Sequence, residues 1–456
     1  MKRYLCLFGI MCSIGFAANA QTAPSLKELI DSAIIRNYEL ANKMLEIQDT
    51  EIDQKKLKDA YLPHVSITGK EAFMLSSFNV KTPEILIPQL NIDIKEGHNR
   101  YTATGNLMTA SAGAEMLVYS GGKVPALKKA LEEKKNAQIA LLEKDRQEIR
   151  ATIHQAYDQM ALFVQMKALL VESEKRLAAN KATANKALGY GLITKYEHQK
   201  IEVAQSKLES KNLEYEGKRS LVLKQLYLLT NIDPARLELI DHTLEPTFVN
   251  INEGTIENRA EIKALEASIL ANKFKMQSEK KWFVPKVQAA TSLGYVGLSG
   301  GHLNSSKPVL PGGSKKLSTN MPALNIFPMF NIGIGFKWDI FDGNAGKHAV
   351  QKAALDVQKS ENSKKSALEK LELNQANAQT NYNIANAQIA LKEKQKKIAQ
   401  DALTQATNEY RLGLITSSQL IDAENDYQNA AMEYVQSVFD QRRAADELLQ
   451  ATGSLE

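Results

Sequence analysis

The chain has 456 residues, 24% of them charged, and a formal net charge of +5 at pH 7. So mild a charge argues against a nucleic-acid-binding protein, which needs a clustered basic face. The only cysteines are Cys6 and Cys12, so the rest of the chain forms no disulfide and no thiolate metal site.

The N-terminus has the features of a secretory signal peptide. A basic pair, Lys2 and Arg3, precedes the apolar stretch Tyr4–Phe16, and the small residues "ANA" precede Gln21. We therefore predict a signal peptide at residues 1–20 and an exported chain that begins at Gln21. Beyond it, no apolar run reaches the roughly 18 residues of a transmembrane helix.

The tetrapeptide "GLIT" occurs twice, at Gly191–Thr194 and Gly413–Thr416, 222 residues apart. The same offset places Pro63 on Pro285, and "YSG" at residues 119–121 on "FDG" at residues 341–343. A constant offset over so long a stretch indicates a duplicated unit. The predicted parts are a first repeat at 21–234, a linker at 235–245 and a second repeat at 246–456.

Each repeat begins with a helical stretch, Ser25–Tyr61 and Ile256–Phe283, that ends before a proline. Segments that alternate apolar and polar residues follow, most clearly "FNIGIGFKWDIF" from Phe330. This period predicts strands with one apolar face, each about 11 residues long, as a tilted bilayer-crossing strand needs. The predicted strands are 64–76, 106–119, 286–299 and 329–341, with long irregular loops at 77–105 and 300–328.

Long helical hairpins, at about 123–230 and 346–451, are predicted to follow the strands. A helix of 66 residues spans ~100 Å, and charged residues such as Glu172 and Arg176 indicate a solvated face. The "GLIT" turns mark the hairpin tips, because glycine adopts the left-handed conformation that ends a helix. The threonine of each turn starts a capping box with the Glu or Gln three residues later.

These features occur together in one family. An exported duplicated unit, an aromatic-(Asp/Ser)-Gly motif before a long helical hairpin and the "GLIT" tips resemble the TolC family of outer-membrane efflux proteins. The resemblance covers essentially the whole exported chain. It implies a mainly α fold with a membrane β-barrel, built from duplicated helical-hairpin and β-hairpin units. Three chains would form a trimeric barrel of about 12 strands, continued by a long periplasmic α-helical tube.

The resemblance also implies a function and a location. The homotrimer would lie in the cell outer membrane with a long periplasmic portion. It would be the exit duct of a tripartite efflux or type I secretion system. Substrates would pass from a periplasmic adaptor (membrane fusion) protein and an inner-membrane transporter to the exterior. The substrate, the partner pump, the resting state of the gate and the role of the long loops stay open.

The family's adaptor-docking pattern, R-x-G-L-x-(S/T), points to the two tips. The second tip matches it fully, whereas Gly189 replaces the arginine at the first. Acidic residues beyond the tips imply a periplasmic gate, although a capping residue and a solvated helix face are the plainer interpretations. The expected docking residues are Gly191, Leu192, Thr194, Arg411, Gly413, Leu414 and Thr416, and the expected gate residues are Asp422 and Glu197.

The sequence gives no support for an enzyme. Seven histidines are scattered without metal-binding spacing, and there is no serine or cysteine nucleophile motif. We therefore expect no catalytic residue, no metal, no cofactor and no nucleic-acid partner. The alternative function is a soluble or surface-associated periplasmic coiled-coil scaffold without channel activity. A general porin fits less well, because porins are nearly all strand.

Overall fold

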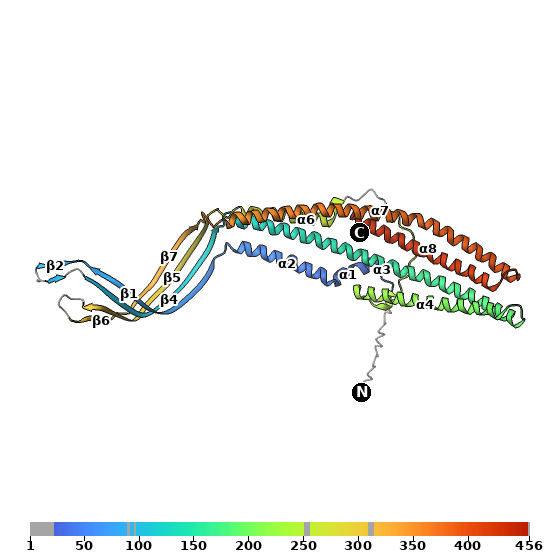
Figure 1. Ribbon diagram of the computed structural model, residues 1–456, viewed down its shortest axis with the longest axis horizontal. Coiled ribbons are helices and arrows are strands. Elements are labelled where there is room, and N and C mark those ends of the chain that lie inside the picture. Colours follow the sequence, from blue (N-terminus) through green and yellow to red (C-terminus); the bar gives the residue numbers. More distant parts are fainter. Residues whose placement is uncertain (1–21, 89–91, 95–96, 250–255, 309–313, 455–456) are drawn as a thin grey trace, which may run out of the picture. The chain divides into compact units, whose positions relative to one another are not determined.

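The computed structural model describes residues 22–88, 92–94, 97–249, 256–308 and 314–454 (Figure 1). The predicted signal peptide lies outside the described residues. The chain divides into two compact units. The helical unit comprises Met1–Ile47, Asn136–Glu266 and Asn362–Glu456, and the sheet unit comprises Gln48–Lys135 and Ala267–Glu361.

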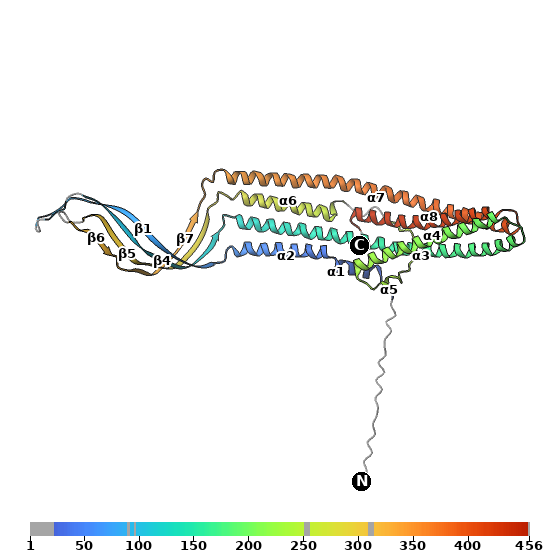
Figure 2. The same ribbon diagram turned by 60° about the horizontal axis from the view of Figure 1, so that its bottom comes forward.

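The long helices of the two repeats match residue for residue at the offset of 222. Helices α3 (Lys123–Gly189) and α7 (Ala345–Arg411) have 67 residues each. Their returning partners, α4 (Lys195–Thr230) and α8 (Ser417–Thr452), have 36 residues each. Figure 2 shows α3 turning into α4 and α7 turning into α8. At 1.5 Å per residue, each long helix extends ~100 Å.

The first helical stretch is broken, although the sequence predicts one helix over residues 25–61. The structure has α1 (Leu26–Arg36) and α2 (Tyr38–Asp59), separated by Asn37 with ψ of 112°. The Asn37 side chain accepts a hydrogen bond of 2.9 Å from the Leu40 backbone N–H. Asparagine favours such a cap over a helix interior, and this preference explains the break. The second repeat has η2 (Ile256–Asn258) and α6 (Ala260–Glu279) at the matching place.

The core of the helical unit includes residues of the predicted linker. Linker residues Leu237 and Ile240 are almost fully buried, in one cluster with Leu29, Ile153 and Leu226. Leu237 ends the short helix α5 (Pro234–Leu237). The linker therefore adds apolar side chains to the packing of the first hairpin. Among the described residues, no helix is both long enough and apolar enough to cross a membrane.

The sheet unit contains an antiparallel sheet to which both repeats contribute strands. Its four long strands follow the order β1-β4-β5-β7, and a short strand, β6, also pairs with β5. The strands are β1 (His64–Thr82), β4 (Gly97–Tyr119), β5 (Lys286–Pro308), β6 (Lys316–Asn320) and β7 (Leu324–Lys337). Strands β2 (Ile85–Ile87) and β3 (Ile92–Ile94) form a separate small hairpin.

Strand lengths differ from the sequence-based expectation. Residues 77–82, 97–105 and 300–308 belong to paired strands, where the sequence suggests irregular loops. In these segments apolar and polar residues no longer alternate clearly, so the sequence pattern does not indicate a strand. The backbone pairs there nevertheless, because ladder hydrogen bonds do not depend on the side-chain pattern. By contrast, β7 ends at Lys337, four residues before the predicted end of that strand at 341.

One face of the sheet is apolar and open to solvent in the single chain. The side chains of Ile67 on β1 and of Ile332 and Ile334 on β7 are 75% exposed or more. The alternate positions are polar or small, such as Thr68 and Asn331. The predicted period-two pattern is therefore confirmed. A contiguous apolar surface of this kind marks a contact with lipid or protein.

Candidate functional site

The two hairpin tips have the same backbone structure. Gly191 and Gly413 have φ angles of 72° and 73°, the left-handed region that suits glycine. The Leu192 N–H donates to the Ala187 carbonyl at 2.8 Å, and the Leu414 N–H makes the matching bond to a helix carbonyl at 2.9 Å. Both helices therefore end in the turn that the "GLIT" motif predicts.

Both predicted capping boxes are confirmed. The Thr194 hydroxyl accepts from the Glu197 N–H at 3.2 Å, and the Glu197 carboxylate accepts from the Thr194 N–H at 3.2 Å. Thr416 and Gln419 form the same pair of bonds at the second tip. Glu197 thus stabilises the start of α4 with a carboxylate, where α8 uses a neutral amide. Its role at a gate stays a prediction.

The tips expose large apolar side chains. Leu192 is 76% exposed and Leu414 is 70% exposed, whereas the isoleucine that follows each of them packs against a buried cluster. Arg411 is also exposed at the second tip. A single exposed leucine is ordinary, but more apolar side chains accompany these two, forming a surface suited to a protein partner. They are Tyr190, Tyr196 and Leu412.

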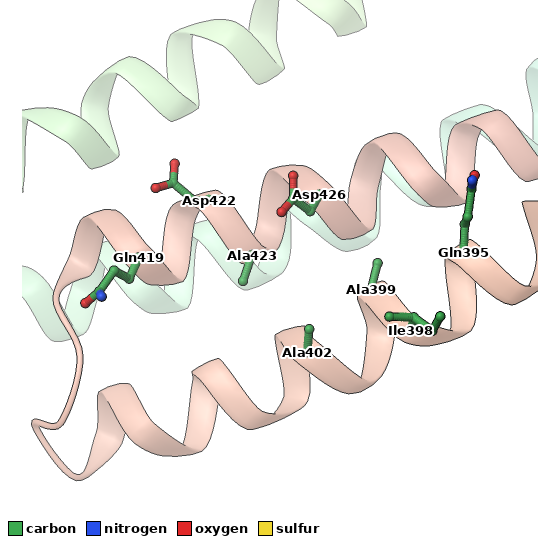
Figure 3. Close-up of a pocket in the computed structure, with 8 residues that line it drawn as sticks. All are labelled: Gln395, Ile398, Ala399, Ala402, Gln419, Asp422, Ala423 and Asp426. Atoms are coloured by element: carbon green, nitrogen blue, oxygen red, sulfur yellow. The ribbon is translucent and has the colours of Figure 1, made fainter.

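A cavity of about 500 Å³ lies between α7 and α8 near the second tip. Figure 3 shows Ala399 and Ala402 pointing from α7 toward α8, with Ala423 pointing back. In Figure 3 the Asp422 side chain points away from α7, and Asp426 follows it one helical turn later; both residues line the cavity. Asp426 was missed by the sequence analysis, although its spacing of four residues from Asp422 places both on one helix face.

The first hairpin carries larger side chains at two of the matching positions. There, Leu177 and Ile201 stand in place of Ala399 and Ala423, and they are only 5% and 1% exposed. The two hairpins therefore differ in the size of the apolar side chains that face the partner helix near the tip.

A buried ion pair joins the two hairpins close to the tips. Arg176 on α3 donates through Nε to both carboxylate oxygens of Glu424 on α8, at 2.8 and 3.0 Å. The Glu424 side chain is only 8% exposed, and the guanidinium lies 5.1 Å from the ring centroid of Tyr427. Burial opposes the charge of Arg176, but bonding to Glu424 raises its pKa overall. The pair fixes α8 to α3.

This ion pair corrects the sequence-based assignment of Arg176 to a solvated face. The Arg176 side chain is only 27% exposed. One signal was present in the sequence: Glu424 lies on the same helix face as the buried residues Leu420, Tyr427 and Ala431. A charged residue on a buried face needs a partner of opposite charge. Identifying that partner required the tertiary structure.

A second buried cluster holds the linker to the helices. Arg442 on α8 donates to both oxygens of Asp158 on α3, at 2.6 and 3.0 Å, and to the Glu245 carbonyl of the linker at 3.0 Å. His242 lies 3.3 Å from Asp158 and stacks on Tyr157. Burial alone would raise the pKa of Asp158, but hydrogen bonds from His242 and Arg442 hold it below its ordinary value.

This lowered pKa predicts a loss of stability in acid. A carboxyl group whose pKa is lower in the folded state stabilises the fold above its unfolded pKa of 3.8. The contribution disappears as the pH falls through the lowered value. Thermal melting of the wild type should therefore depend more steeply on pH than that of Asp158→Asn, between about pH 5 and pH 2. Asp401→Asn, at an exposed position on α7, should give the same dependence of melting temperature on pH as the wild type. The same dependence in all three proteins would contradict the prediction.

Within the described ranges, no group of three or more His, Cys, Asp or Glu side chains is arranged to hold a metal ion. Of the expected site residues, the structure gathers Gly191, Leu192 and Thr194 at one turn. It gathers Arg411, Gly413, Leu414 and Thr416 at the other. The docking and gate roles of these residues stay predictions.

Comparison with known proteins identifies the second repeat. Residues 253–454 match the family model described as outer membrane efflux protein. The chain carries an outer membrane efflux protein domain. The match confirms the resemblance recognised in the sequence, and the outer membrane is the location that the family's description gives. Among curated proteins, none matches the chain.

Solved outer-membrane channels share the fold of this chain. The outer-membrane channel OprN matches with a TM-score of 0.71 and 13% identity, over 94% of this chain and 90% of that one. The Campylobacter jejuni CmeC channel matches with a TM-score of 0.69 and 16% identity, over 94% of this chain and 86% of that one. The Vibrio cholerae outer membrane protein VceC matches with a TM-score of 0.68 and 18% identity, over 94% of this chain and 96% of that one. The predicted fold class, mainly α with a β-sheet region, is confirmed.

Proposed function

We propose that this chain is one subunit of an outer-membrane exit duct in a tripartite efflux or secretion system. One observation carries the proposal: a chain with an efflux-protein domain has both an apolar sheet face and apolar hairpin tips. One sheet face is apolar and open, as contact with lipid requires. The helical hairpins end in two matching apolar tips, as docking of a periplasmic partner requires.

The duct requires more than one chain. Four long strands are too few to close a membrane barrel, since the smallest such barrels have about eight strands. Three copies would supply about 12 strands, with the apolar face toward lipid and the polar face toward water. A soluble scaffold, the alternative, would leave the apolar face of β1 and β7 in water. That exposure disfavours the scaffold.

The partners in this proposal are a periplasmic adaptor and an inner-membrane transporter. The adaptor would contact the tips through Leu192 and Leu414, with Arg411 at the second tip where the first has Gly189. Asp422 would line the periplasmic entrance, and Asp426 would extend the same acidic face by one helical turn. Three symmetry-related carboxylates would attract cations and repel one another.

Extraction from membranes tests the duct. The protein should require detergent for release from outer membranes and should have the mass of a trimer in detergent. Imaging should show a cylinder with a helical shaft ~100 Å long. A monomer, or a protein released without detergent, would support the scaffold instead.

A tip substitution tests docking. Leu414→Glu should reduce efflux at least about ten-fold, because a charge replaces an exposed apolar contact, equivalent to about 1.4 kcal/mol of coupling. Protein level and trimer mass should not change, since the side chain is 70% exposed and its loss leaves no cavity. Efflux by cells that express each variant at equal levels is the measurement.

Leu414→Met is the matched control and should keep normal efflux. Leu192→Glu at the first tip should have a smaller effect, because that tip has Gly189 in place of the arginine. Normal efflux by the Leu414→Glu trimer would show that the second tip is not a docking site.

A further inference from the structure

The apolar face of the sheet ends before its strands do. On β1 this face includes Ile67, Phe73 and Leu75, each 67% exposed or more. Strand β1 continues for seven residues past Leu75, and its register with β4 is unbroken from His64 to Thr82. Because side chains alternate along a regular strand, the same face can be followed to the end of the pair.

Past Leu75 this face is polar and then basic. Asn79 lies opposite Arg100, and Lys81 lies opposite His98. All four side chains are exposed, and the Arg100 guanidinium donates to the Asn79 carboxamide oxygen at 3.4 Å, a neutral partner. Lys81 and Arg100 are diagonal neighbours on adjacent strands, with Cα atoms about 7 to 8 Å apart. Two long cationic side chains at that separation can reach one phosphate group.

Strands β5 and β6 extend the basic surface. Thr104 of β4 lies opposite Leu75 on one side and opposite His302 of β5 on the other. His302 in turn lies opposite Asn320 of β6. Lys316 comes four residues before Asn320 on β6, and an even spacing along a strand keeps it on the same side of the sheet. Both His302 and Lys316 are exposed. We call this surface the basic band; its residues are Lys81, His98, Arg100, His302 and Lys316.

Acidic residues are absent from this face at the level of the basic band, within the strands that the structure describes. The nearest one on the face is Glu71 of β1, eight residues before Asn79. At ~3.3 Å per residue, that spacing is about 26 Å along the strand. Glu84 and Asp93 lie beyond the last pair of the β1–β4 ladder. The face therefore has an excess of positive charge at this level, which attracts anions.

The height of the basic band matches the headgroup region of a bilayer. Arg100 lies opposite Asn79, which is 14 residues beyond Val65 at the start of the apolar face. A strand tilted by ~40° rises ~35 Å along the membrane normal over that stretch, at ~3.3 Å per residue. The hydrocarbon core is about 30 Å thick, so the band lies just outside it. In the proposed duct the helices are periplasmic, so the leaflet at this end of the strands is the outer one.

We propose that the basic band is a binding site for the phosphate groups of lipids in the outer leaflet. The proposal rests on the outer-membrane duct and goes beyond it by assigning a class of lipid to one surface. Arg100 forms paired hydrogen bonds with a phosphate, and the ammonium groups of Lys81 and Lys316 add positive charge. The apolar side chains next to the band on the same face contact the acyl chains of the same lipid.

Two glycolipids that differ only in phosphate test the proposal: lipid A and dephosphorylated lipid A, each added to the purified protein in detergent. Native mass spectrometry counts the lipids bound to each protein. The wild type should bind lipid A at least about ten-fold more tightly, because each cation near an anionic lipid surface adds to the attraction. Lys81→Gln/Arg100→Gln/Lys316→Gln should bind both lipids equally. Its trimer mass should not change, since all three side chains are exposed.

The matched control removes the same number of charges from the other face of the sheet. Lys70→Gln/Lys286→Gln/Lys337→Gln changes three exposed lysines on the polar face and should keep the wild-type preference. An equal preference in all three proteins, or none in a wild type of trimer mass, would overturn the lipid site and leave the duct intact. Displacement of lipid A by an equimolar amount of inorganic phosphate would indicate a site for the free anion and would also overturn it. A protein of monomer mass, released without detergent, would overturn both proposals.

Discussion

Replacing Glu424 with alanine is expected to loosen the second hairpin from the first and to open the periplasmic end of the duct. Glu424 is the buried partner of Arg176, and removal of one member of a buried pair costs about 3 to 5 kcal/mol. We expect a lower melting temperature and a several-fold higher single-channel conductance in planar bilayers.

Glu433→Ala on the same helix is the matched control. Glu433 pairs with Lys392 at 2.7 Å but is 56% exposed, and such surface pairs contribute about 1 kcal/mol or less. It should resemble the wild type in both measurements. If Glu424→Ala behaves like Glu433→Ala, then the Arg176 pair does not hold the hairpins together.

Replacing Arg442 with alanine is expected to release the linker and to destabilise the helical unit by about 3 to 5 kcal/mol. The substitution removes two hydrogen bonds to Asp158, one to the Glu245 carbonyl and one to the Thr247 hydroxyl. It leaves the Asp158 carboxylate, 6% exposed, with His242 as its remaining side-chain hydrogen-bond partner. Denaturant unfolding in detergent measures the loss.

The neighbouring residue provides the control. Arg443→Ala removes ion pairs with Asp440 at 3.6 Å and with Glu447 at 3.7 Å, and the Arg443 side chain is 46% exposed. The substitution should therefore lower the free energy of unfolding by about 1 kcal/mol or less. The double variant Asp158→Leu/Arg442→Met should recover much of the stability, because it leaves no unpaired buried charge. An Arg442→Ala protein as stable as Arg443→Ala would contradict this role for the cluster.

Local and periodic features were predictable from the sequence. The 222-residue duplication, the left-handed glycines and the capping boxes depend on residue type at fixed short spacings. Hence Thr194 and Thr416 begin their helices as expected. The apolar faces of β1 and β7 were also predictable, because a period of two directly reflects the strand backbone.

Other features were not predictable, for distinct physical reasons. The break at Asn37 interrupts an otherwise helical pattern through one side-chain cap. The strand extensions at 77–82 and 97–105 depend on backbone pairing between segments whose side chains do not alternate clearly. The end of β7 at Lys337 has no local signal, because the apolar and polar residues continue to alternate beyond it.

The sequence by itself determined the repeat, the helices, the tips and the family resemblance, because each is encoded over a few turns of helix or strand. Only the tertiary structure decided which charges are buried together. Arg176 and Glu424 are 248 residues apart in the chain, and Asp158 and Arg442 are 284 apart. No local pattern pairs residues at such distances. Their pairing depends on which helix faces meet, and packing of the whole helical unit sets those faces.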